Sequence, residues 1–82
     1  MEQLIHSLKA LGATIKRQRK AKKLTQTEVG NEFNIDQSTL SSVEQGAEGT
    51  RLITLFRILA ALDLEMVIRS KGTKRSDDME SW

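Results

Sequence analysis

The chain has 82 residues, enough for one small domain. Apolar residues make up 38% and charged residues 29%, as in soluble globular proteins, and no apolar run approaches the roughly 18 residues of a membrane span. The absence of cysteine excludes disulfides and thiolate metal sites and fits a reducing cytoplasm. A single histidine, His6, and no phosphate-binding glycine motif leave few groups for catalysis. We therefore expect a cytoplasmic protein with no enzymatic activity, no cofactor and no metal site.

Positive charge is concentrated in the first third of the chain. Residues 7–27 carry seven positive side chains and no negative one, although the formal net charge is only +2. Such a cluster is either a solvated helix face or a surface for phosphates. Charge alone does not separate these alternatives, so a second signal is needed.

Two helices are predicted before residue 35. Apolar residues at spacings of four, three and four favour a helix from Ser7 as N-cap to about Lys22. The next segment, Thr25-Gln26-Thr27-Glu28, has the pattern of a capping box and predicts a short second helix that ends at Asn34. The apolar residues of the first pattern are Leu4, Leu8, Leu11 and Ile15.

A third helix is predicted after Asp36, a suitable N-cap, and should stop at Gly46. Only Leu40 and Val43 can anchor it to a core. A solvated helix selected for stability would not favour serine, but short hydroxyls and amides suit a helix that lies against base edges in a major groove. This polar face is the second signal beside the basic cluster. It consists of Gln37, Ser38, Ser41, Ser42 and Gln45.

Apolar spacing predicts a fourth helix over residues 52–62 and an extended segment after it. In that segment Leu64, Met66 and Ile68 share one face. The chain offers no second strand, so this strand is expected to pair with its copy in a two-fold symmetric dimer. The alternative is that the segment continues the preceding helix.

Helix, tight turn and helix over residues 25–45 form a helix-turn-helix. Residues 8–64 resemble the DNA-binding domain of the phage-repressor (Cro/C1, or XRE) family. The resemblance is carried by Leu24-Thr25-Gln26-Thr27-Glu28-Val29, by the segment from Ile35 to Gly46, and by Leu52, Leu55, Ile58, Leu59, Ala61 and Leu62.

A narrower resemblance, to HipB-type antitoxins, covers residues 11–69 and the end of the chain. It is carried by the Leu-Thr-Gln start, the loop length, Thr54-Leu55-Phe56-Arg57-Ile58-Leu59, the expected strand and a short polar tail that closes on Trp82. It implies a dimeric repressor that binds operators of its own operon and neutralises a HipA-type serine/threonine kinase toxin, on one chain or split over several. The tail, residues 70–82, differs in detail from that family.

The resemblance implies roles for individual residues. It implies base contacts for Gln37, whose amide could pair with adenine, and for Ser38 and Ser42. Gln26, at a helix N-terminus, is expected to meet a phosphate. It also implies a partly buried structural ion pair between Arg19 and Glu44, which would remove Arg19 from the DNA contacts. Further phosphate candidates are Thr39, Thr50 and Arg51, although Thr39 could instead cap its helix and Arg51 could be solvated.

The tail is too polar to fold alone, and the single tryptophan at its end is either incidental or an anchor for a partner. We therefore predict an all-α helix-turn-helix bundle of about four helices with one C-terminal strand that pairs across a dimer. Residues 1–69 form the domain for DNA binding and dimerisation, and residues 70–82 form a flexible charged tail. The function predicted is an antitoxin that represses transcription. The alternatives are a regulator without a toxin partner, a pure protein-interaction module and, most remotely, an enzyme.

Overall fold

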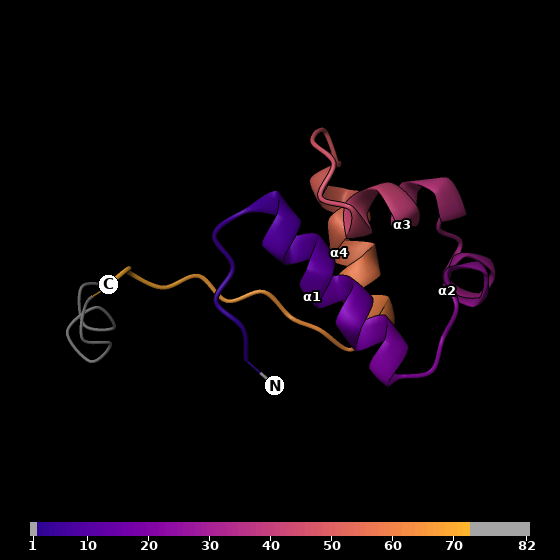
Figure 1. Ribbon diagram of the computed structural model, residues 1–82, viewed down its shortest axis with the longest axis horizontal. Coiled ribbons are helices and arrows are strands. Elements are labelled where there is room, and N and C mark those ends of the chain that lie inside the picture. Colours follow the sequence, from indigo (N-terminus) through magenta and orange to yellow (C-terminus); the bar gives the residue numbers. More distant parts are fainter. Residues whose placement is uncertain (1, 73–82) are drawn as a thin grey trace.

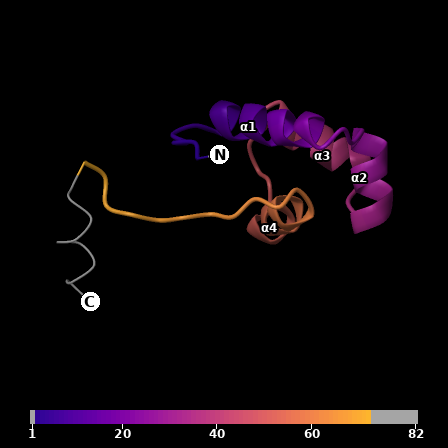
Figure 2. The same ribbon diagram turned by 90° about the horizontal axis from the view of Figure 1, so that it is seen from below.

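The computed structural model describes residues 2–72, so residues 73–82 of the expected tail, including Trp82, lie outside the described residues. Within this range the chain folds as four helices and no strand (Figure 1). Helices α1 and α3 lie in one layer, α4 lies across the opposite side, and α2 closes one end (Figure 2). The elements are α1 (Leu8–Ala21), α2 (Gln26–Phe33), α3 (Gln37–Glu44) and α4 (Leu52–Ala61).

The first three helices begin at the residues that the sequence predicts. The hydroxyl of Ser7 accepts a hydrogen bond from the backbone of Ala10 at 3.0 Å. Thr25 and Glu28 form the complete capping box, with bonds of 3.0 and 2.8 Å. The carboxylate of Asp36 accepts from the backbone of Ser38. These side chains satisfy N–H groups that a helix leaves unpaired at its start.

A residue in the left-handed region stands at or just after the end of every helix. Lys23, Asn34, Gly46 and Asp63 have φ values of 61°, 57°, 83° and 58°. This conformation lets the following N–H groups bond back to the last carbonyls. At Gly46 a side chain would also collide, because a Cβ there would lie 2.8 Å from Cα of Lys9. Glycine is therefore required at Gly46 for two separate reasons.

The core is a single apolar cluster between the two layers. Helix α1 approaches α3 so closely that a Cβ on Gly12 would lie 2.4 Å from the carbonyl oxygen of Val43. This close crossing supports the position of α3. The buried apolar side chains are Ile15, Val29, Ile35, Leu40, Val43, Leu55, Ile58, Leu59, Ala61 and Leu62.

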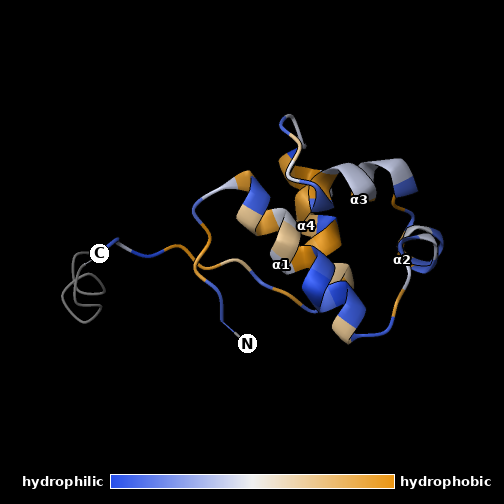
Figure 3. Ribbon diagram, in the orientation of Figure 1, coloured by the Kyte–Doolittle hydropathy of each residue, from blue (hydrophilic) through white to orange (hydrophobic). Residues whose placement is uncertain are grey.

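Helix α4 is more apolar than the core requires (Figure 3). Leu52 and Phe56, two of the residues that define its sequence pattern, are 66% and 48% exposed, and Ile53 is 60% exposed. The apolar spacing thus predicts the helix but includes Leu52 and Phe56, which do not pack into the core. The reason is geometric: no other part of residues 2–72 covers that side of α4.

The chain does not continue α4 beyond Leu62, so the helical alternative for the following segment is wrong. The backbone N–H of Leu64 bonds to the carbonyl of Leu59 at 2.8 Å, and Asp63 adopts the left-handed conformation that ends the helix. Residues 64–70 then extend away from α4 and make neither the hydrogen bonds of a helix nor those of a strand (Figures 1 and 2). Leu64 packs on the core, whereas Ile68 is 89% exposed. Pairing of this segment with a second copy stays a prediction.

Candidate nucleic-acid interface

Helix α3 presents an outer face that is polar and carries no charge. Leu40 and Val43 bury the inner side, while Gln37, Ser38 and Ser42 are exposed. Figure 3 shows α3 pale, in contrast to the strongly apolar α4 and the hydrophilic second half of α1. The exposed groups both donate and accept hydrogen bonds, which is what contacts to base edges require.

A buried ion pair ties α3 to α1. Arg19 Nε and Glu44 Oε2 lie 2.6 Å apart, and Arg19 Nη2 donates to Glu44 Oε1 at 3.0 Å. Arg19 Nη1 also donates to the carbonyl of Leu24 at 2.8 Å. The hydrogen bond to Glu44 raises the pKa of Arg19 above its usual value, against the opposing effect of burial, and the charge of Glu44 raises it further. The expected pair is thus present, and Arg19 points into the protein.

Gln26 joins the same network. Its Nε2 donates to Glu44 Oε1 at 3.1 Å, and the residue is only partly exposed. A side-chain amide carries two N–H groups, so one remains for a phosphate. The sequence suggested a phosphate contact at this position but not the bond to Glu44.

The structure also contains a contact between α2 and α3 that the sequence did not predict. The hydroxyl of Thr27 donates to Gln37 Oε1 at 3.2 Å. Thr27 lies inside the capping-box tetrapeptide without taking part in it, and nothing in the spacing singles it out. The sequence offers only two polar residues, ten positions apart, on either side of the tight turn. They come into contact only when the turn folds.

The start of α3 is organised by Asp36. Its Oδ1 accepts from both the backbone N–H and the hydroxyl of Ser38, each at 3.0 Å. The Ser38 hydroxyl hydrogen is thereby used, which leaves its oxygen as an acceptor. A carboxylate at this helix N-terminus also disfavours a phosphate there. The backbone N–H groups at the start of α3 are therefore not expected to bind a phosphate themselves.

The other phosphate candidates lie on separate elements. Thr39 and Thr50 are partly buried, and Arg51 is exposed at the start of α4 with no side-chain capping bond. In the basic cluster, Arg17 donates to Gln3 at 2.9 Å and Lys22 pairs with Asp63 at 2.6 Å. The other members besides Arg19 are exposed: Lys9, Lys16, Lys20 and Lys23.

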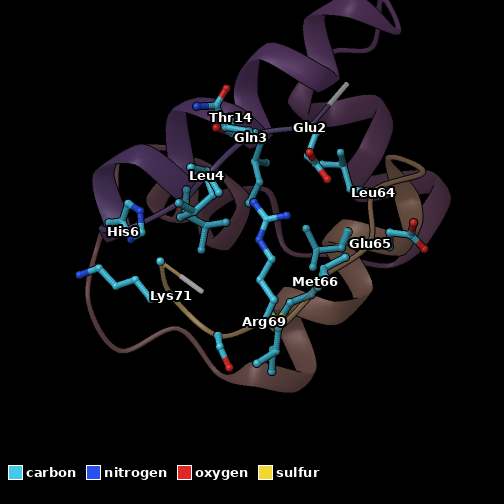
Figure 4. A pocket seen from close by; sticks show the side chains of 18 residues that line it. Glu2, Gln3, Leu4, His6, Thr14, Leu64, Glu65, Met66, Arg69 and Lys71 are labelled. Atoms are coloured by element: carbon cyan, nitrogen blue, oxygen red, sulfur yellow. The ribbon is translucent and has the colours of Figure 1, made fainter. Parts of the chain in front are cut away.

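A second surface feature lies away from α3. The N-terminal segment and the segment after α4 border a groove of about 670 Å³ (Figure 4). Its lining is mainly apolar, and Met66 and Ile68 contribute to it although they are 45% and 89% exposed. Apolar side chains left open in this way are typical of protein contact surfaces. The apolar residues that line the groove are Leu4, Ile5, Leu11, Ile15, Leu59, Leu64, Met66, Val67 and Ile68.

Residues 2–72 contain no group of acidic or histidine side chains that could hold a metal ion. None of the helices in this part of the chain is long and apolar enough to cross a membrane. His6 is exposed at the border of the groove.

Comparison with known proteins identifies relatives of this arrangement. The helix-turn-helix family matches residues 15–68. Antitoxin HipB of Escherichia coli (strain K12) is 35% identical over 66 residues, which cover 80% of this chain and 75% of that protein. A solved HipA–HipB–O2–O3 complex contains a chain with 32% identity and a TM-score of 0.79, and a HipB–O4 20mer complex gives 32% and 0.80. In both cases the matched region covers 87% of this chain and the whole of the other chain.

Proposed function

This chain belongs to the HipB antitoxins of the helix-turn-helix family, and from that premise we propose that it is a repressor that neutralises a HipA-type kinase toxin. It acts as a dimer on an inverted-repeat operator, with two α3 helices in successive major grooves about 34 Å apart. It works in the cytoplasm and catalyses no reaction. The observation that carries the DNA-binding part is the uncharged polar face of α3, held to the domain by the Arg19–Glu44 pair.

The proposed contacts divide into two kinds. Gln37, Ser38 and Ser42 contact base edges and supply the choice of sequence. Phosphate contacts supply affinity that depends on salt, and come from Gln26, Thr39, Thr50 and Arg51. Arg19 and Glu44 hold α3 in place and touch no DNA.

Dimerisation uses the segment after α4. A strand with Leu64, Met66 and Ile68 on one face pairs with its copy, which satisfies backbone groups that the single chain leaves open. The exposure of Met66 and Ile68, and of Ile53 and Phe56 on α4, supports an apolar interface with a second copy.

Co-purification tests the two activities together. The chain is expressed with the product of the neighbouring gene, and the eluate is titrated with its own promoter DNA at several salt concentrations. The proposal expects a stoichiometric kinase partner and specific binding that weakens with salt. Specific binding without a partner would instead establish a regulator with no toxin.

Trp82 is proposed as the anchor for the toxin, because tryptophan is favoured at interface hot spots. Deleting residues 79–82 should weaken binding to the kinase and leave operator binding unchanged. Equal kinase affinity for the full and the shortened chain would reject this role.

A further inference from the structure

We infer that Thr27 is a positioning residue for operator recognition: its hydroxyl fixes the side-chain amide of Gln37 and thereby favours adenine at the base pair that Gln37 contacts. The inference rests on the proposed DNA-binding function. It starts from the 3.2 Å hydrogen bond by which Thr27, on α2, donates to Gln37 Oε1, on α3.

The backbone around Thr27 is well fixed. The capping box of Thr25 and Glu28 sets the first turn of α2. Gln26, the residue before Thr27, bonds to Glu44, the last residue of α3. Two consecutive residues of α2 therefore hold opposite ends of α3, and the hydroxyl of Thr27 is presented to Gln37 from a rigid support.

The bond restricts a side chain that otherwise has many conformations. Gln37 is exposed at the first position of α3, and a free glutamine rotates about three side-chain bonds. Holding it before DNA arrives reduces the ordering cost of binding. Both partners are exposed, so water competes for the bond, and the expected effect is that of one neutral hydrogen bond rather than loss of all binding.

The geometry also selects a base. With Oε1 held by Thr27, the amide keeps one free lone pair on the oxygen and the donors of Nε2. Adenine offers the complement, the N6 amino group and the N7 acceptor, whereas guanine offers two acceptors, O6 and N7. A fixed carbonyl oxygen would face O6 of guanine and repel it. A released amide can turn its Nε2 toward guanine, so loss of the hydroxyl should weaken the preference for adenine.

The experiment measures binding of the full chain to a library of randomised DNA duplexes, for wild type and for Gln37→Ala, Thr27→Val and Thr27→Ser. Gln37→Ala first identifies the base pair at which discrimination disappears. Thr27→Val, which keeps the shape but not the hydroxyl, should reduce adenine-over-guanine discrimination about three- to tenfold at that same pair and leave the rest of the motif intact. Thr27→Ser should retain the wild-type preference.

Two results would overturn the inference while the proposed function stands. One is unchanged discrimination in Thr27→Val, and the other is a loss at a different base pair, which would mean that Thr27 contacts DNA directly. If no base pair depended on Gln37, both the inference and the proposed base contact of Gln37 would fail. A wild-type protein that selects no motif would overturn the proposed DNA-binding function as well. Threonine and valine have similar helix propensities, so thermal unfolding should be unchanged. If Thr27→Val fails to fold, Thr27→Ala removes the same hydroxyl, and its adenine-over-guanine discrimination is measured in the same way.

Discussion

Helices α3 and α4 are neighbours in the chain and contribute to one core, yet they expose opposite kinds of side chain. The outer face of α3 consists of hydroxyls and amides, including Gln37 and Ser42. The outer face of α4 contains Ile53 and Phe56, which are 60% and 48% exposed. Neither face is covered by another helix of residues 2–72, and each suits a different kind of partner: α3 suits the edges of bases and α4 suits a protein surface. One small domain thus offers surfaces for two kinds of binding, because α3 and α4 are fixed to the same core with their outer faces separate.

The largest expected effect comes from removing the support of α3. Glu44→Ala leaves Arg19 as a buried, unpaired cation and frees the amide of Gln26. We expect the free energy of unfolding to fall by about 3 kcal/mol, measured by denaturant titration. Glu48→Ala, an exposed glutamate in the loop after α3, is the control. Unchanged stability together with weaker operator binding would mean that Glu44 belongs to the DNA contacts instead.

The exposed face of α4 is tested through the oligomeric state. Phe56→Ala removes an aromatic side chain from the proposed contact with a second copy and should raise the dimer dissociation constant about a hundredfold, measured by analytical ultracentrifugation. Arg57→Ala, a change at an exposed neighbour on the same helix, should have little effect. A dimer as tight as wild type would exclude this face from the interface.

The polar face of α3 should respond in DNA binding and not in stability. Gln37→Ala removes a base contact and should lower the preference for operator over random DNA about tenfold per half-site. Competition titrations with the two DNAs measure this, and thermal unfolding serves as the control because Gln37 is exposed. If affinity for both DNAs fell equally, Gln37 would be a phosphate contact rather than a base contact.

The smallest effect is expected at Arg51, at the boundary between the two helices. Arg51→Ala should weaken binding to all sequences about threefold and reduce the slope of log K against log salt by about 0.9 per subunit. The dimer should be unaffected, because Arg51 is not among the apolar residues proposed for the dimer interface. A wild-type slope in the variant would show that Arg51 is merely solvated.

Much of this molecule follows from local rules in the sequence. Ser7, Thr25 and Asp36 cap their helices as predicted, and Asn34 ends α2, because capping depends on only a few neighbouring residues. The resemblance to HipB-type antitoxins, drawn from residues 11–69 and the end of the chain, is confirmed by the relatives. The roles of Gln37, Ser38 and Ser42 remain predictions.

Tertiary structure decided what local rules could not. Only the packing of α2 against α3 brings Gln26 to Glu44 and Thr27 to Gln37, because these pairs are 18 and 10 residues apart. Only the fold shows that Leu52 and Phe56 lie on the uncovered side of α4, since a periodic pattern marks apolar residues without saying what covers them. The sequence by itself determined the four helices, the N-caps of the first three and the polar character of α3. Contacts between distant segments decided which side chains support that face. They also decided which apolar side chains stay exposed.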